Sequence, residues 1–304
     1  MHDGRPGLAR LERARFPSRA SHRARAGVSA SRNARPSNVP HDHPSPADFD
    51  LPGWMFPIIL GAIVLTAIRH ISCGVVACFA MMLAVSQARS SWESLDPAWR
   101  DAYAEAWASW SAGCFGIGCV MVDGQGTIVA RGRNRVLEPA TAPGALADTL
   151  IAHAEMNALA DFDLDRGTGE ALTLYTPVEP CLMCASAILM VRIGRVRFAV
   201  ADPMFEGLQQ TLGDHPYCAE RMPHRDGPLN GPMAVFAGLL PLMFNMTWTP
   251  RGRWMRLHES LFPDQHRLAS NLIASRRLVS IAADAGVVTD ALEEIWDDLV
   301  SLSS

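Results

Sequence analysis

HAEMNAL, residues 153–159, and PCLMCASAI, residues 180–188, are the two stretches that decide the character of this chain. The first supplies one imidazole, His153, and the second supplies two thiols, Cys181 and Cys184. Together they offer three protein ligands to a tetrahedral zinc ion and leave the fourth position to water, the arrangement of a catalytic zinc site. Glu155 stands two residues after His153, where its carboxylate can handle the protons of that water. The pattern therefore predicts a hydrolytic metal site.

Both stretches are expected at the starts of helices. There, the partial positive charge of a helix N-terminus favours thiolate over thiol and hence zinc binding. The three-residue spacing of Cys181 and Cys184 places both sulfurs on one helix face. A purely structural zinc would need a fourth protein ligand, for which His215 and Cys218 are the candidates. A redox pair is a further alternative for the two cysteines of the Cys-x-x-Cys motif.

From Asp96 onward, the pattern predicts strands alternating with helices, which is typical of an α/β layered domain. Asp96-Pro97 resembles a helix N-cap followed by the first helical residue. The strands are expected at Ile117–Asp123, Thr127–Arg131, Ala171–Thr176, Arg195–Ala201 and Pro232–Gly238. Helices are expected after Pro97, around HAEMNALADF, and at Cys181–Val191, Gln265–Val279 and Thr289–Leu302.

Four motifs carry a resemblance to a known family: GCVMVDGQGTIVARGRN, HAEMNAL, LYTPVEPCLMC and IGRVRFAVAD. The stretch from Ile117 to Gly238 resembles the cytidine/deoxycytidylate (CMP/dCMP) deaminase superfamily of zinc-dependent nucleobase and nucleoside deaminases. Within it, the branch of tRNA-adenosine and guanine deaminases is most similar. The resemblance implies a three-layer α/β/α sandwich around a five-stranded mixed sheet, the cytidine deaminase-like fold. It also implies that Asn134 and Ala154 bind the substrate base and that a homodimer is one assembly to expect.

One departure from the family pattern bears on the substrate. Relatives among the tRNA enzymes tend to have Pro-Val-Gly-Ala where this chain has Gly116-Ile117-Gly118-Cys119. Cys119 is bulkier than alanine, and we expect it near the pocket wall, where it would alter the choice of base.

The resemblance and the site residues together predict a zinc-dependent hydrolytic deaminase. It would remove an exocyclic amino group from a free nucleobase, a nucleoside or a related small molecule. Zinc-bound water would attack the amine-bearing carbon while Glu155 shuttles protons. One alternative is a tRNA-specific adenosine deaminase. A non-enzymatic alternative is an inactive zinc-stabilised binding module, which would have no need of Glu155.

The distribution of charge disfavours a large polyanionic partner such as tRNA. Residues 51–304 hold eighteen Arg against twenty-six acidic residues, and the chain contains no Lys. Proteins that bind nucleic acids usually present a basic patch, because neutralising phosphates supplies much of the affinity. Apart from the two motif cysteines, five of the seven cysteines remain, and free thiols in a reducing compartment explain them best, which favours the cytoplasm.

Composition, motifs and the family resemblance together divide the chain into four predicted segments. Residues 1–50 are rich in Arg, Ser and Pro and are predicted to be disordered. Residues 51–88 are apolar and have three interpretations: a membrane anchor, a membrane hairpin, or upstream sequence read in frame before true initiation at Met81 or Met82. Residues 93–244 are predicted to form the zinc-dependent deaminase domain, and residues 245–304 a helical C-terminal extension.

Overall fold

The computed structural model describes residues 80–139, 146–163 and 168–303. The predicted disordered segment 1–50 and most of the apolar segment 51–88 lie outside the described residues. Within the described ranges, no helix is both long enough and apolar enough to cross a bilayer. Residues 83–94 are helical, and Ala84 and Ala88 from the end of the apolar segment lie in the hydrophobic core.

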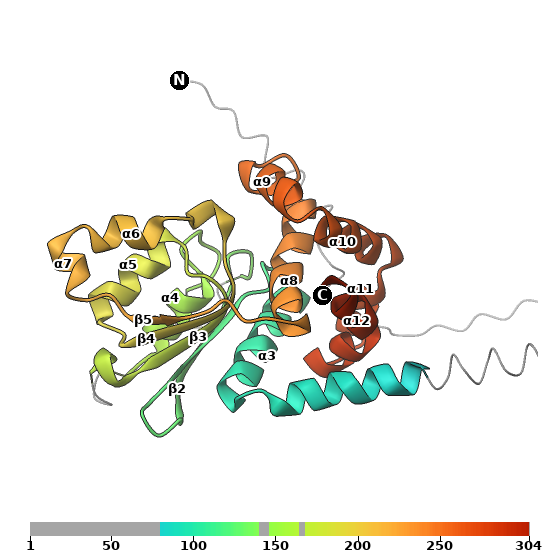
Figure 1. The fold of residues 1–304 in the computed structure, drawn as a ribbon, viewed down its shortest axis with the longest axis horizontal. Helices are drawn as coiled ribbons and strands as arrows, with labels where there is room; N and C mark the ends of the chain where they lie inside the picture. The colour runs from blue at the N-terminus through green and yellow to red at the C-terminus, as the bar shows by residue number, and fades with distance from the viewer. Residues whose placement is uncertain (1–79, 140–145, 164–167, 304) are drawn as a thin grey trace, which may run out of the picture. The chain divides into compact units, whose positions relative to one another are not determined.

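A five-stranded mixed sheet lies at the centre of the fold (Figure 1). Its strands are β1 (Gly118–Val122), β2 (Ile128–Arg133), β3 (Thr173–Val178), β4 (Arg195–Val200) and β5 (His224–Asp226). The spatial order is β2-β1-β3-β4-β5. β1 runs antiparallel to β2 and β3, whereas β4 runs parallel to β3 and β5. The predicted five-stranded mixed sheet is confirmed.

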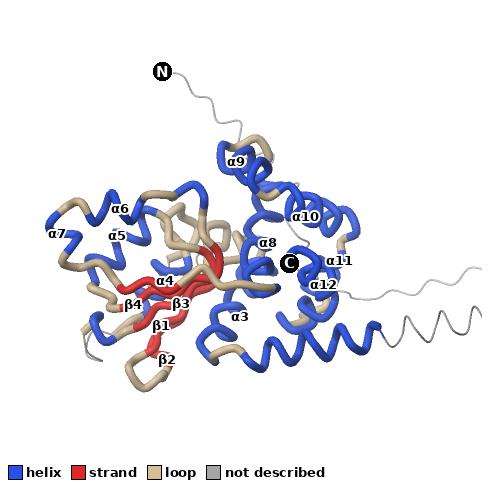
Figure 2. The backbone as a smooth tube through the Cα atoms, viewed as in Figure 1, coloured by secondary structure: helices blue, strands red, loops and turns tan. Residues whose placement is uncertain are grey.

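Helices surround this sheet and continue beyond it toward the C-terminus (Figure 2). Asp96 caps the first of them as predicted, because its Oδ1 accepts a hydrogen bond from the backbone N–H of Ala98 at 3.0 Å. The bounds are α3 (Pro97–Ser111), α4 (Ala154–Asp161), η3 (Gly169–Ala171), α5 (Leu182–Val191), η4 (Pro203–Phe205), α6 (Leu208–Gly213), α7 (Pro216–Ala219), α8 (Pro232–Trp248), α9 (Arg253–Leu261), α10 (Pro263–Ser275), α11 (Arg277–Ala283) and α12 (Val288–Leu302).

The residues of β1 show how the three layers form. Successive side chains of a strand point to opposite faces of the sheet. Val120 and Val122 belong to the hydrophobic cluster that contains α3 and α8. Cys119 and Met121 belong to a second cluster, which contains residues of α4 and α5. Burial on both faces therefore produces the α/β/α sandwich, and the predicted fold class is confirmed.

One predicted strand is wrong. Pro232–Gly238 forms the start of α8, a helix of 17 residues, and the fifth strand is instead β5. Residues 233 and 235–244 are all buried, so α8 is apolar around its whole circumference and shows no helical stripe. A short apolar run of this kind cannot be separated from a buried strand by periodicity alone.

The C-terminal helices share the core of the sheet. A single cluster joins Val120 of β1 and Phe236 of α8 to Leu292 and Leu299 of α12. The predicted boundary between residues 244 and 245 falls inside α8. The single helix predicted at Gln265–Val279 is divided into α10 and α11, because Arg276 adopts a left-handed conformation with φ of 57°.

Candidate metal centre and substrate cavity

Two helix N-termini bring the three predicted metal ligands together. His153 is the N-cap residue of α4, and Cys181 is the N-cap residue of α5. Cys184 lies in the first turn of α5 and is fully buried. The Sγ atoms of Cys181 and Cys184 are 3.6 Å apart, and they lie 3.6 Å and 3.5 Å from His153 Nδ1. The predicted ligand set is thus assembled by the two helix starts.

These separations match a tetrahedral zinc site. With Zn–S bonds of about 2.3 Å and Zn–N bonds of about 2.1 Å, tetrahedral angles place sulfurs about 3.8 Å apart and sulfur and nitrogen about 3.6 Å apart. Within the described ranges, the cluster of potential metal ligands consists of His153, Cys181 and Cys184. Neither His215 nor Cys218 joins it, so the described residues supply three ligands, the number typical of a catalytic site.

The three ligands perturb one another's pKa values. The pKa of Cys181 is lowered to about 4, because the Cys184 thiol and His153 both hydrogen bond its thiolate. The pKa of Cys184 is raised by its hydrogen bond to Cys181 and by burial. The pKa of His153 is raised, chiefly by its hydrogen bond with Cys181. In the metal-free protein the two cysteines therefore hold one negative charge, and a bound metal ion would displace the second proton.

Glu155 lies beside this cluster, on the first turn of α4. Its side chain is buried, with Oε2 3.3 Å from Cys184 Sγ and Oε1 3.4 Å from the Thr176 hydroxyl. Burial raises the pKa of this carboxyl, and the negative charge on Cys181 raises it further. The carboxylate predicted to move protons is therefore in reach of the metal ligands.

A cavity of about 380 Å³ opens next to the cluster. His153, Glu155, Cys181 and Asn134 form one side of it. Residues of α8, α9 and α10 also line it. The cavity is large enough to hold a small heterocyclic ligand in contact with the metal ligands.

A family comparison identifies the segment that carries this site. Residues 93–200 match the cytidine and deoxycytidylate deaminase zinc-binding region. This segment is similar in sequence to the cytidine deaminase superfamily. Since the matched region is a zinc-binding one and the His/Cys/Cys cluster has zinc geometry, zinc is its cofactor.

Curated relatives of the deaminase segment have different substrates. A tRNA-specific adenosine deaminase from Streptococcus pyogenes is 36% identical over 114 residues, which is 36% of this chain and 63% of that protein. A probable cytosine deaminase from Schizosaccharomyces pombe is 31% identical over 99 residues, which is 33% of this chain and 56% of that protein. The chain thus spans less than two thirds of the length of these relatives.

Two solved structures are similar to parts of this chain. A structure from a study of A-to-I editing by tRNA:A34 deaminases is 27% identical, covers 46% of this chain and 95% of its own, and has a TM-score of 0.38. A guanine deaminase from Nitrosomonas europaea is 20% identical, covers 47% and 80% of the two chains, and has a TM-score of 0.36.

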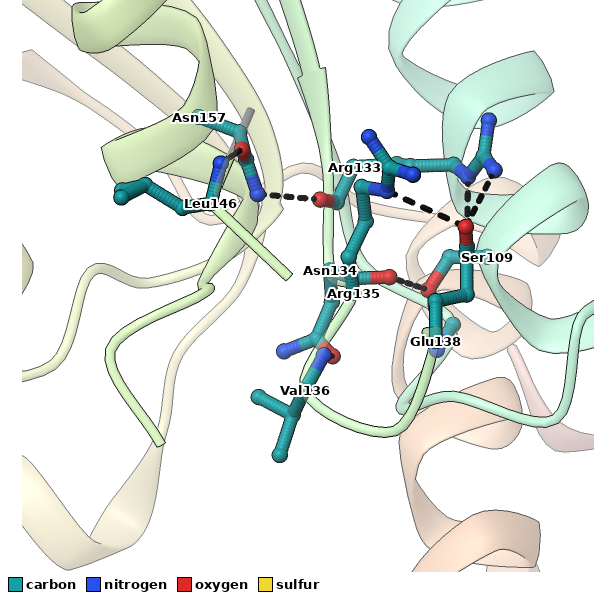
Figure 3. A network of polar contacts seen from close by, with 9 residues as sticks. Ser109, Arg133, Asn134, Arg135, Val136, Glu138, Leu146 and Asn157 are labelled. Atoms are coloured by element: carbon teal, nitrogen blue, oxygen red, sulfur yellow. Dashed lines mark hydrogen bonds and ion pairs between the residues drawn. The ribbon is translucent and has the colours of Figure 1, made fainter. Parts of the chain in front are cut away.

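Asn134 is held at the cavity of the deaminase segment by a buried polar network (Figure 3). Its backbone carbonyl accepts a hydrogen bond from the Ser109 hydroxyl at 2.8 Å. Its side-chain Oδ1 accepts from the backbone N–H of Val136 at 3.2 Å. Because the acceptor Oδ1 is already engaged, the side-chain amide is fixed in one orientation, and its NH₂ group lies at the cavity without a partner among the described residues.

The rest of this network fixes the segment that carries Asn134. Glu138 accepts hydrogen bonds from Arg133 at 3.0 and 2.8 Å and from Arg135 at 3.1 Å. The Asn157 side chain donates to the carbonyls of Arg133 at 3.1 Å and of His153 at 3.3 Å. One amide therefore joins the end of β2 to the start of α4, and so ties the segment carrying Asn134 to the metal ligand His153.

Two predictions about the cavity are not matched. Cys119, expected near the pocket wall, is fully buried in the core on the α4 side of the sheet and does not line the cavity. Its position on β1 gives a reason, because a side chain on this strand faces either one core or the other. Ala154 is also fully buried and does not line the cavity, so its predicted contact with the base stays a prediction.

Sequence reasoning missed the wall formed by the C-terminal helices. Trp254, His258 and Phe262 line the cavity, and so does Gln265 of α10. The signal was present in RWMRLHESLF, because aromatic rings at steps of four residues share one face of a helix. The spacing could not show what this face contacts.

Proposed function

We propose that this protein is a zinc-dependent hydrolytic deaminase that removes an exocyclic amino group from a free nucleobase, a nucleoside or a related small molecule. The observation that carries the proposal is the buried Glu155 carboxylate, 3.3 Å from Cys184 Sγ and at the edge of a cavity of about 380 Å³. A structural zinc site has no use for a buried carboxylate beside its ligands, because burying a charge without a partner is costly.

The side chains at the cavity have separate roles in this proposal. Zinc, when bound, lowers the pKa of a water that it coordinates to about 7. Glu155 accepts the proton of that water and returns it to a ring nitrogen of the base, which makes the amine-bearing carbon electrophilic. The oxygen of the water bonds to the amine-bearing carbon. Glu155 passes the remaining proton of that oxygen to the amino group, the C–N bond breaks, ammonia leaves and a carbonyl remains. Asn134 donates from its NH₂ group to an acceptor on the ring edge of the base.

Two other functions compete with this one. The 36% identity to a tRNA-specific adenosine deaminase supports the same chemistry on tRNA. The excess of acidic residues after residue 50 weighs against it. An inactive zinc-stabilised binding module would need the zinc ligands but not Glu155.

A substrate panel separates these functions. We expect the zinc-loaded full chain to release ammonia from at least one of guanine, adenine, cytosine and their nucleosides. Release from tRNA alone would replace the proposal by the tRNA function. A protein that holds zinc and releases ammonia from none of these would favour the binding module.

Replacing Glu155 tests its role directly. In Glu155→Gln we expect the zinc content to stay at the wild-type level while kcat falls by about 10³-fold, since general acid–base catalysis contributes about 10²- to 10⁴-fold. Ammonia release and metal analysis give the two readouts. Glu206→Gln, an exposed acid outside the cavity, is the matched control and should keep wild-type kcat. Unchanged turnover in Glu155→Gln would contradict the assignment.

A further inference from the structure

The cavity has a second wall that lies outside the segment matching the deaminase family. That segment ends at residue 200, whereas α9 begins at Arg253. Trp254, His258 and Phe262 all line the cavity. They follow one another at steps of four residues along α9 and its C-cap, so their rings form a row along one face of the helix. We call these three residues the aromatic row.

The rings of the aromatic row contact one another. The ring centroids of Trp254 and His258 are 4.8 Å apart with an interplanar angle of 28°, and those of His258 and Phe262 are 4.9 Å apart at 51°. The row is also fixed to the sheet side of the cavity, because Trp254 Nε1 donates to Asp202 Oδ1 at 3.1 Å. Because Trp254 and His258 stack on each other, a heterocycle can stack only on the outer face of Trp254 or on Phe262, and this preformed apolar surface suits its flat face.

The charged side chains that line the cavity besides the metal ligands are all acidic. Outside the metal ligands, the charged side chains that line it are Glu155, Glu179 and Asp202, and no arginine lines it within the described ranges. Arg225, 2.5 Å from Glu179, is engaged by that carboxylate and does not line the cavity. Burial, helped by neighbouring His266, lowers the pKa of His258 to about 4, so its imidazole is neutral at neutral pH.

A phosphate group would therefore be poorly accommodated. Phosphate sites in proteins use Arg or Lys side chains or the free N–H groups of a helix N-terminus. The described cavity wall offers no Arg, the chain contains no Lys, and the helix starts of α4 and α5 are used by the metal ligands. A third helix start, that of α10, reaches the cavity at Phe262 and Gln265, but its first residue Pro263 has no N–H and the Asp264 carboxylate lies in its first turn, which disfavours an anion there. An uncharged base or nucleoside meets none of these difficulties.

We infer that the aromatic row is the specificity wall of the cavity: it stacks on the ring of an uncharged base or nucleoside, and with the acidic lining it rejects the corresponding 5′-monophosphate. This assignment deepens the proposed function and rests on it for the reaction, but it can be tested by binding alone. Arg251, Arg253 and Arg256 are excluded from this wall, because they do not line the cavity.

Binding to a protein that does not turn over tests the inference. Calorimetry on zinc-loaded Glu155→Gln would compare adenine, guanine and cytosine with their nucleosides and 5′-monophosphates. We expect one base or nucleoside to bind at least tenfold more tightly than its monophosphate. Adding Trp254→Leu should weaken that ligand about 5- to 150-fold, since stacking of a base on an aromatic ring commonly has this effect.

Two further variants separate stacking from folding. Trp254→Phe also removes the indole N–H that bonds Asp202 but keeps an aromatic ring, so it should retain most of the affinity that Trp254→Leu loses. Arg253→Gln changes an exposed residue on the same helix and should leave affinity unchanged. In the catalytic protein, Trp254→Leu should raise KM more than it lowers kcat.

Several outcomes would overturn the specificity wall. One is that a 5′-monophosphate binds as tightly as its base or nucleoside, or more tightly. Another is that the Trp254→Leu protein keeps the affinity of the Glu155→Gln parent. A third is that none of the small ligands binds, or that the protein binds only a tRNA and Arg253→Gln weakens that binding. Tight binding of a base without ammonia release from the wild type would instead reject the proposed function and leave the specificity wall in place.

Discussion

The two sides of the cavity were built in different ways. The metal side comes from two short stretches, 153–159 and 180–188, whose side chains are placed by the first turns of α4 and α5. The other side comes from α8, α9 and α10, which follow the deaminase segment. Chemistry that depends on a few ligands at fixed spacing is therefore local in the sequence. The selectivity inferred for the aromatic row depends instead on a helix face whose contacts are set only by tertiary packing.

Removing one metal ligand should disable the metal side and give the largest effect. In Cys184→Ala we expect the zinc content to fall to a small fraction of one ion per chain and ammonia release to fall at least 10³-fold, because two remaining protein ligands hold zinc poorly. Metal analysis and the substrate panel give the readouts. Cys218→Ser, a cysteine outside the ligand cluster, is the matched control. Full zinc occupancy in Cys184→Ala would contradict the ligand assignment.

The packing that positions the metal ligands can be weakened without replacing any of those ligands. A Cβ at Gly132 would lie 2.3 Å from both the carbonyl oxygen of Ala154 and the backbone nitrogen of Ala158, so β2 and α4 could not keep their close approach. We expect Gly132→Ala to lower the free energy of unfolding by about 3 kcal/mol and to reduce activity. Chemical denaturation gives the readout. Gly124→Ala, where a Cβ would meet nothing within 4 Å, is the control. Equal stability of the two variants would contradict the packing.

A smaller effect is expected where the C-terminal helices join the sheet. The buried Tyr103 hydroxyl of α3 donates to the carbonyl of Met233, in the first turn of α8, at 2.9 Å. Tyr103→Phe should lower the free energy of unfolding by about 1 kcal/mol, the usual contribution of one hydrogen bond, while zinc content stays unchanged. Thermal or chemical denaturation would measure it. In the control Tyr217→Phe, at an exposed residue, the change should stay within about 0.5 kcal/mol. A loss of zinc in Tyr103→Phe would show that the two sides are more tightly coupled than the hydrogen bonding indicates.

The strands and metal ligands of the deaminase segment could be predicted from the sequence because their signals are local. Strand alternation, the Asp96 cap and the Cys-x-x-Cys spacing each depend on residues within a turn or two. They placed four of the five strands, and the three metal ligands meet as the motif indicates. Glu155 also lies where the motif suggests, although its catalytic role stays a prediction.

The failures arose where the outcome depends on distant packing. Pro232–Gly238 was predicted as a strand because its apolar residues show no period, and only its burial between the sheet and α12 explains the helix. Cys119 was expected near the pocket because it replaces an alanine of the family pattern, but this comparison does not tell which face of the strand its side chain takes. Three-residue β5 carries too short a pattern to be recognised, since its partner β4 lies 24 or more residues earlier in the chain.

Helix α8 belongs both to the hydrophobic core and to the cavity wall. It covers one face of the sheet through residues such as Phe236, and it lines the cavity through Gly238 and Pro241. A substitution that reshapes the cavity from this helix is therefore also a substitution in the folding core. In the aromatic row, Trp254 packs against the same core and His258 is buried, whereas Phe262 is exposed. A change of the cavity wall at Phe262 should therefore cost less stability than a change in α8 or at Trp254.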